Sequence, residues 1–181
     1  YEHILFDQNR HIPFAGLPDM RERTVLISSF SKTLSMTGWK VGYLYAPSQL
    51  TAGIRSAHQF LTFCAASPFQ AALSQVIDRL PDYYAQLHQE YQERRDLFLN
   101  LLNDAGFTTC APGGTYFAVV DVAPMGYSDG AEFCRHITIN HKVAAIPAKA
   151  FYTTPGVGDS LVRFAFCKGL DSLREAGRRL I

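Results

Sequence analysis

The side chains that could do chemistry are concentrated in residues 28–43, SSFSKTLSMTGWKVGY. Lys32 is flanked there by small hydroxyl residues. A lysine held partly out of water near other cations offers a neutral amine that can attack an aldehyde. Ser29 precedes it with a hydroxyl and Lys40 follows with a second positive charge, and such a pair can hold a phosphate. The spacing therefore indicates a lysine that condenses with a phosphorylated aldehyde.

A plainer interpretation of the same residues stays open on spacing alone. Most lysines in proteins are solvated, and a serine-rich loop with two lysines is a common pattern. Lys32 and Lys40 could therefore be surface side chains with no ligand.

A single arginine, Arg163, stands in the otherwise apolar run Leu161 to Phe166. An unpaired buried charge is costly, so an arginine in such a strand needs a partner. The partner is either an acidic side chain of the same chain or an anionic ligand.

Two short apolar runs enclose residues 30–39 and position them. Thr24 to Ser29 and Lys40 to Ala46 are rich in β-branched and aromatic residues, and both are predicted to be buried strands. Between them, Phe30 to Trp39 is predicted to be a polar loop. A polar loop displayed by a rigid scaffold is a common place for chemistry.

Beyond residue 47 the pattern is first helical and then mixed. Pro68 stands in the first turn of one predicted helix, and Gly106 ends a long amphipathic one. After Gly106 short strands alternate with helices, which is an α+β pattern. Predicted helices cover residues 49–63, 69–79, 82–103, 130–140 and 171–180, and predicted strands cover 115–121, 143–146 and 161–166. Aromatic residues at such spacing are expected in the core, among them Trp39, Phe60, Phe63 and Tyr116.

The composition limits the classes of partner. Seventeen basic and sixteen acidic side chains leave a formal charge of +1, so neither nucleic acid nor a membrane is an expected partner. No apolar run reaches the roughly 20 residues of a membrane-spanning helix. The cysteines are widely spaced, so we expect no metal site, free buried thiols and a reducing, cytoplasmic location; they are Cys64, Cys110, Cys134 and Cys167.

The whole string of residues 28–43 resembles the lysine signature of the class I/II aminotransferases of fold type I, which use pyridoxal 5'-phosphate (PLP). Its ending, TGWKVGY, is most similar to that of the methionine and kynurenine aminotransferases. By position, Lys32 resembles the lysine that forms the Schiff base with PLP and acts as the catalytic base. Ser29 resembles the phosphate-binding hydroxyl, and Lys40 the basic phosphate ligand.

Further residues are assigned by the same resemblance. Tyr1-Glu2-His3 resembles the end of the family's Asp-Glu-x-Tyr-Glu motif, in which the tyrosine hydrogen-bonds the phenolic oxygen of PLP, so Tyr1 is expected to bind the cofactor. Arg163 matches the arginine that grips the substrate α-carboxylate in a bidentate fork. Residues 113–117 and 146–147 also resemble family strings, as turn and packing elements that line the site.

The resemblance extends over essentially the whole chain and implies an α/β fold. The expected structure is the C-terminal part of the fold type I PLP-dependent transferase fold, with the end of the large PLP-binding domain at residues 1–80 and a small α+β domain at residues 81–181. The family's aspartate that pairs with the pyridine nitrogen would precede residue 1. The sequence therefore predicts a fragment, and we expect this chain alone to bind PLP weakly or not at all.

The implied activity is amino transfer from an L-amino acid, with methionine or aromatic types favoured, to a 2-oxo acid. The resemblance also implies a homodimer. Three alternatives remain open. A PLP-dependent carbon-sulfur lyase would release pyruvate and ammonia without an acceptor, an aminotransferase-like regulatory domain would carry an upstream DNA-binding module, and an incomplete fragment would be catalytically inert.

Overall fold

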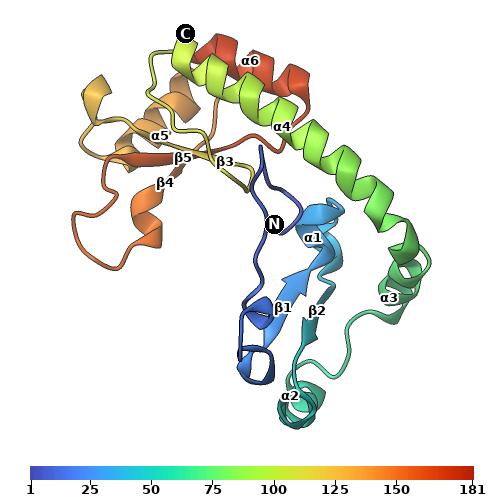
Figure 1. The fold of residues 1–181 in the computed structure, drawn as a ribbon. Coiled ribbons are helices and arrows are strands. Elements are labelled where there is room, and N and C mark those ends of the chain that lie inside the picture. Colours follow the sequence, from blue (N-terminus) through green and yellow to red (C-terminus); the bar gives the residue numbers. More distant parts are fainter. The chain divides into compact units, whose positions relative to one another are not determined.

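The two apolar runs around Lys32 pair with each other as antiparallel strands in the computed structural model, which describes residues 1–181. Strands β1 (Leu26–Ser29) and β2 (Gly42–Tyr45) are in a register that places Ser29 opposite Gly42. Figure 1 shows the two strands side by side, with helix α1 (Phe30–Thr33) at one end. The ladder therefore brings the two ends of the segment that contains Lys32 together.

The chain divides into two units, Tyr1–Leu87 and His88–Ile181, and each is described by itself. The division falls within the long helix α4, after Leu87, whereas the expected domains meet between residues 80 and 81. The assignment of a large and a small domain stays a prediction. The first unit holds β1, β2, α1, α2 (Ser48–Leu61) and α3 (Ser67–Ser74), and α4 spans Leu80–Asp104. No helix has the length and hydropathy needed to cross a bilayer.

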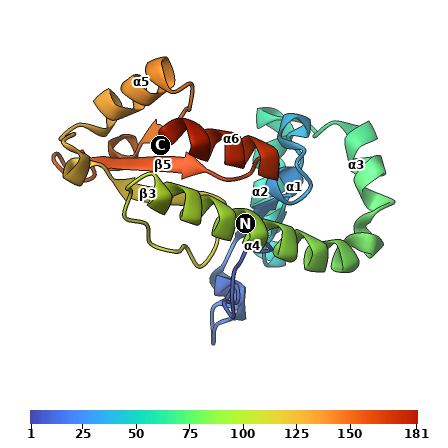
Figure 2. The same ribbon diagram turned by 90° about the horizontal axis from the view of Figure 1, so that it is seen from above.

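The second unit is built on a three-stranded antiparallel sheet in the order β3-β5-β4. Figures 1 and 2 both show α6 lying alongside the carboxy-terminal part of α4. The two helices are in close contact, because a Cβ added to Gly177 of α6 would lie 2.8 Å from the Leu101 side chain of α4. The elements are β3 (Phe117–Asp121), α5 (Gly130–Asn140), β4 (Ile146–Pro147), β5 (Leu161–Ala165) and α6 (Leu170–Leu180).

One face of this sheet forms the core of the second unit. Phe164 of β5 is almost fully buried, and its ring lies 5.9 Å from those of Phe98 and Phe107 in edge-on geometry. Side chains alternate across a strand, so the opposite face carries Phe117, Val119 and Arg163. Arg163 therefore lies on the face of the sheet opposite the core.

The strands of the first unit differ from the prediction in their burial. All four residues of β2 are exposed, and Ile27 of β1 is 78% exposed. Apolar composition predicts burial only where another layer covers the sheet, and the elements of this unit leave these faces uncovered.

The burial of several aromatic and cysteine side chains also corrects the prediction. Tyr116 is buried as expected, but Phe60 and Phe63 are 86% and 76% exposed, and Trp39 is 38% exposed. Cys134 is buried, whereas Cys64 and Cys110 are exposed. Spacing places a side chain on one side of an element, but it does not say whether that side has a neighbour.

Two elements differ from the prediction in type or extent. The segment predicted as a polar loop forms the short helix α1 and a 3-10 helix, Thr37–Trp39. The strand expected at residues 143–146 is reduced to Ile146–Pro147, because the backbone N–H of Val143 bonds to the carbonyl of Ile137 at the end of α5. The other predicted helices and strands exist, with shifted ends.

Replacement of Gly42 by alanine is expected to lower the free energy of unfolding by about 1–3 kcal/mol. The added Cβ would lie 2.6 Å from the carbonyl oxygen of Ser28, which forces the β1–β2 ladder apart. The measurement is the midpoint of urea unfolding. Gly53→Ala is the matched control, because this exposed helical glycine has open space around its Cβ position and alanine there should raise stability. Equal effects of both changes would contradict the prediction.

Candidate functional site

Lys32 lies on a short helix that is held at both ends. Ser29 caps the beginning of α1, and its Oγ accepts a hydrogen bond from the backbone N–H of Ser31 at 3.1 Å. At the other end, the hydroxyl of Tyr83 donates to the carbonyl of Thr33 at 2.7 Å. Lys32 is half-buried, and its ammonium has no hydrogen-bond or ion-pair partner in the chain. The amine is thus placed on a fixed backbone without being neutralised.

Lys40 is brought to the same end of the β1–β2 ladder. The backbone N–H of Phe30 bonds to the carbonyl of Val41 at 3.3 Å, so the residue after Lys40 adjoins the beginning of α1. Lys40 has a left-handed backbone with φ of 55°, which is uncommon for a residue with a side chain. The ring of the preceding Trp39 stacks on Phe69 of α3 at 4.5 Å. The backbone of Lys40 is therefore held in a defined place, and its side chain is exposed.

Tyr1 is tied to the strand that leads to Lys32 through its neighbour Glu2. The hydroxyl of Ser28 donates to the Glu2 carboxylate at 2.6 Å. Burial acts to raise the pKa of Glu2, but the hydrogen bond from the Ser28 hydroxyl acts to lower it, and the net shift of the pKa is downwards. Glu2 is thus an ionised anchor on β1, and it places Tyr1, which is 40% exposed, in the same unit as Lys32.

The donor set of the first unit fits a phosphorylated aldehyde. Lys32 supplies an amine without an internal partner, Ser29 a hydroxyl and Lys40 an exposed cation. A carbonyl reacts with an amine, and a phosphate binds to hydroxyl and ammonium donors. These are the functional groups that PLP requires at its two ends.

Arg163 lies in the second unit, in the middle of β5, between Val119 of β3 and Ile146 of β4. Its guanidinium carbon lies over the rings of Phe117 and Phe151, at 4.0 and 4.3 Å from their centroids. No carboxylate of the chain pairs with it, and its buried Nε has no hydrogen-bond partner. The internal salt bridge that the sequence left open is therefore absent, and the guanidinium can take an external anion.

The contacts of Phe117 and Phe151 with Arg163 are not predicted from the sequence. Phe117 ends the string GGTYF, which is expected to line the site only as a turn and packing element, and Phe151 lies beyond the second such element, Ile146-Pro147. Cation–π contacts join residues that are distant in sequence, so no local spacing signals them.

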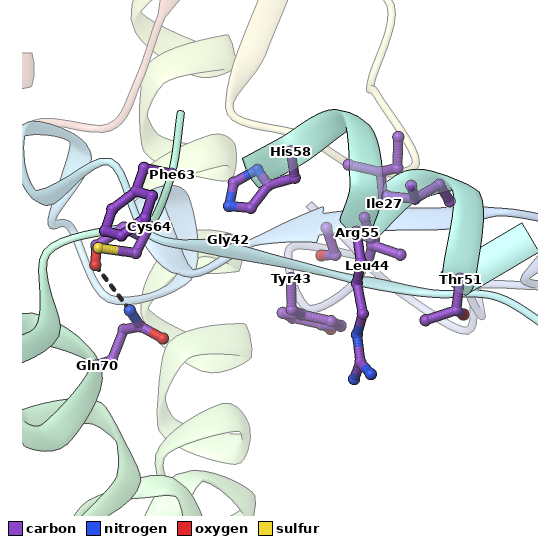
Figure 3. A pocket seen from close by; sticks show the side chains of 13 residues that line it. Ile27, Gly42, Tyr43, Leu44, Thr51, Arg55, His58, Phe63, Cys64 and Gln70 are labelled. Carbon is purple, nitrogen blue, oxygen red and sulfur yellow. Dashed lines mark hydrogen bonds between the residues drawn. The ribbon is translucent and has the colours of Figure 1, made fainter. Parts of the chain in front are cut away.

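The first unit also contains a pocket of about 610 Å³ that is distinct from the predicted residues. Figure 3 shows it between β2 and α2, with His58 and Arg55 projecting from the helix and Phe63 and Gln70 beyond it. The amide of Gln70 donates to the carbonyl of Ala65 at 2.8 Å. None of the five predicted site residues lines this pocket.

Similarity to known proteins covers nearly the whole chain. The family model for aminotransferase class I and II matches residues 1–179. A probable N-succinyldiaminopimelate aminotransferase of Mycobacterium tuberculosis is 42% identical over 99% of this chain and 47% of its own. The methionine aminotransferase of Escherichia coli is 42% identical over 99% of this chain and 46% of its own. The chain thus spans about half the length of these curated relatives.

Solved structures agree with this similarity. The N-succinyldiaminopimelate aminotransferase from Mycobacterium tuberculosis superposes with a TM-score of 0.94 at 43% identity, over 99% of this chain and 47% of its own. The Escherichia coli protein with methionine aminotransferase function superposes with a TM-score of 0.93 at 42% identity, with 99% and 47% coverage. The chain has the α/β fold of the C-terminal part of the fold type I transferases, whose members use PLP, and it belongs to the class I and II aminotransferase family.

Proposed function

We propose that the protein containing this chain is a PLP-dependent aminotransferase that moves an amino group from an L-amino acid, of methionine or aromatic type, to a 2-oxo acid. The observation that carries this proposal is the Lys32 amine, which stands without an internal partner on a helix capped by Ser29 and adjoined by Lys40. Because the chain covers about half of its relatives, the activity is proposed for the full-length protein.

The proposed roles follow from the chemistry of each group. When bound, PLP supplies an electron sink that makes the α-hydrogen of an attached amino acid acidic. Lys32 would hold the aldehyde end of the cofactor through its amine and would accept the α-proton of the substrate at Nζ. Ser29 and Lys40 would bind the phosphate, and the hydroxyl of Tyr1 would hydrogen-bond the phenolic oxygen.

Arg163 is proposed to orient the substrate through its α-carboxylate. A guanidinium offers two parallel N–H donors that match a carboxylate, and the absence of an internal acid leaves them available. An amino acid held at its carboxylate has a fixed orientation, which favours reaction at its α-carbon.

The preferred amino acid is proposed from the relatives and from the resemblance of residues 28–43. Proteins similar to this chain are named for methionine, for N-succinyldiaminopimelate and, in Dictyostelium discoideum, for kynurenine with oxoglutarate. The last is 34% identical over the whole chain and 46% of its own length. A homodimer and a cytoplasmic location stay predictions.

The test is an amino-donor panel on the full-length protein with PLP and 2-oxoglutarate as acceptor. The panel contains methionine, phenylalanine, kynurenine, N-succinyldiaminopimelate and aspartate, and product 2-oxo acids are quantified. We expect methionine or an aromatic donor to have a kcat/KM at least about tenfold above that of aspartate, which corresponds to about 1.4 kcal/mol. Preference for N-succinyldiaminopimelate would overturn the substrate assignment. Release of pyruvate and ammonia from a sulfur amino acid without an acceptor would indicate the lyase instead.

A further inference from the structure

We propose that Phe117 and Phe151 form an aromatic clamp on Arg163 that admits only anions lying in the plane of the guanidinium, and so selects carboxylates over sulfonates. This inference rests on the proposed function, in which Arg163 binds the substrate carboxylate. It adds two specificity-determining residues and the physical basis of their selectivity.

The clamp is defined by two ring contacts from different elements. Phe117 comes from the beginning of β3 and Phe151 from the 3-10 helix Ala148–Phe151. Both rings lie within stacking distance of the guanidinium carbon, with their centroids at 4.0 and 4.3 Å from it. Two rings this near to one carbon cannot occupy the same face of the guanidinium, so they cover its two faces and leave its edge open.

Burial of Nε limits which donors along the edge of the guanidinium an anion can reach. This nitrogen is out of solvent contact and has no acceptor, while the two terminal nitrogens form no hydrogen bond and no ion pair within the chain. The free donors of Arg163 therefore point in one direction and lie in one plane. A carboxylate, whose two oxygens are coplanar with its carbon, can meet both donors at once.

The backbone before Phe117 holds its ring in place. Thr115 has a left-handed φ of 68°, which is costly for a β-branched residue and is maintained only where surrounding structure requires it. Its Oγ1 accepts a hydrogen bond from the N–H of Phe117 at 3.2 Å. The preceding turn is held as well, because the buried Arg95 donates to the carbonyl of Pro112 at 3.4 Å.

Phe151 is positioned by an ion pair and a close ring contact on either side of it. The Lys149 ammonium lies 2.7 Å from the carboxylate of Asp129, which also caps the beginning of α5. This hydrogen bond from Lys149, with the one from the Ala131 N–H, lowers the pKa of Asp129. On the other side, the ring of Tyr152 packs closely on Gly158, because a Cβ added to this glycine would lie 2.6 Å from the ring. The backbone on both sides of Phe151 is thus held, and the ring itself contacts Arg163.

The selectivity follows from the shape of the anion. A sulfonate carries three oxygens around a tetrahedral centre, so two oxygens in the guanidinium plane leave the third directed out of it. Out of that plane the space above the guanidinium is taken by the two rings. Weakening one side of the clamp should therefore favour the sulfonate relative to the carboxylate.

The experiment compares the affinities of 3-phenylpropionate and 2-phenylethanesulfonate for the full-length protein loaded with PLP, by calorimetry. Neither compound has an amino group, so binding is measured without turnover. The variants are Phe151→Ala, Phe151→Tyr and Arg163→Ala. Phe151 is 58% exposed, so its truncation should leave the fold intact, and Phe117→Ala serves as a second variant for the other side of the clamp.

We expect the wild-type protein to bind the carboxylate at least about tenfold more tightly than the sulfonate, a difference of about 1.4 kcal/mol. Phe151→Ala should reduce that ratio to below about threefold, and Phe151→Tyr should preserve it. An unchanged ratio in both alanine variants overturns the clamp. If Arg163→Ala leaves the affinity for both anions unchanged, the proposed role of Arg163 itself fails, which distinguishes the two errors.

Discussion

Replacement of Lys32 by alanine in the full-length protein is expected to lower kcat for amino transfer by more than about 10⁴-fold. A positioned general base is worth about 10²–10⁴ in rate, and the same amine also provides the covalent attachment of the cofactor. Removing it takes away both contributions at once. The measurement is the initial rate of 2-oxo acid formation at saturating donor and acceptor.

Lys32→Arg separates the charge from the nucleophile. Arginine keeps the positive charge but does not lose its proton in proteins, so it should be as inactive as the alanine variant. Lys168→Ala is the matched control, because Lys168 is exposed and lies in the other unit. Turnover retained in Lys32→Ala, with the control active, would remove Lys32 from the catalytic role.

Replacement of Arg163 by alanine is expected to raise KM for the amino donor and to lower kcat/KM by about 10²–10³. Removing one partner of a desolvated, hydrogen-bonded charge pair costs about 2–5 kcal/mol, and the guanidinium has no internal acid that would be left unpaired. Stability should therefore change little. The kcat/KM of Arg163→Lys should lie between those of the wild type and Arg163→Ala. An ammonium keeps the charge but is a point charge that cannot form the bidentate fork.

A substrate without the carboxylate isolates this interaction. Methioninamide should be a poor donor for the wild-type protein, and Arg163→Ala should process it no worse than the wild type does. Arg135→Ala is the control, since Arg135 is an exposed arginine of the same unit, on α5. If Arg163→Ala lowered kcat/KM equally for methionine and its amide, the carboxylate assignment would be wrong.

The sequence alone determined the family and the kinds of element in the fold. The full string of residues 28–43 carries the resemblance to the class I and II aminotransferases, and the family match confirms that the chain belongs to them. Helices such as α4 and α5 were predictable because their apolar residues recur at the helical period and their ends carry proline, aspartate or glycine. These signals are local.

Only the tertiary structure decided what surrounds each side chain. It showed that Arg163 has aromatic neighbours in place of an acid, that β2 is exposed, and that Gly42 must be glycine because Ser28 is 2.6 Å from its missing Cβ. Each of these facts depends on residues brought together from distant parts of the chain. Periodicity records which side of an element is apolar, whereas burial and pairing depend on what packs against that side.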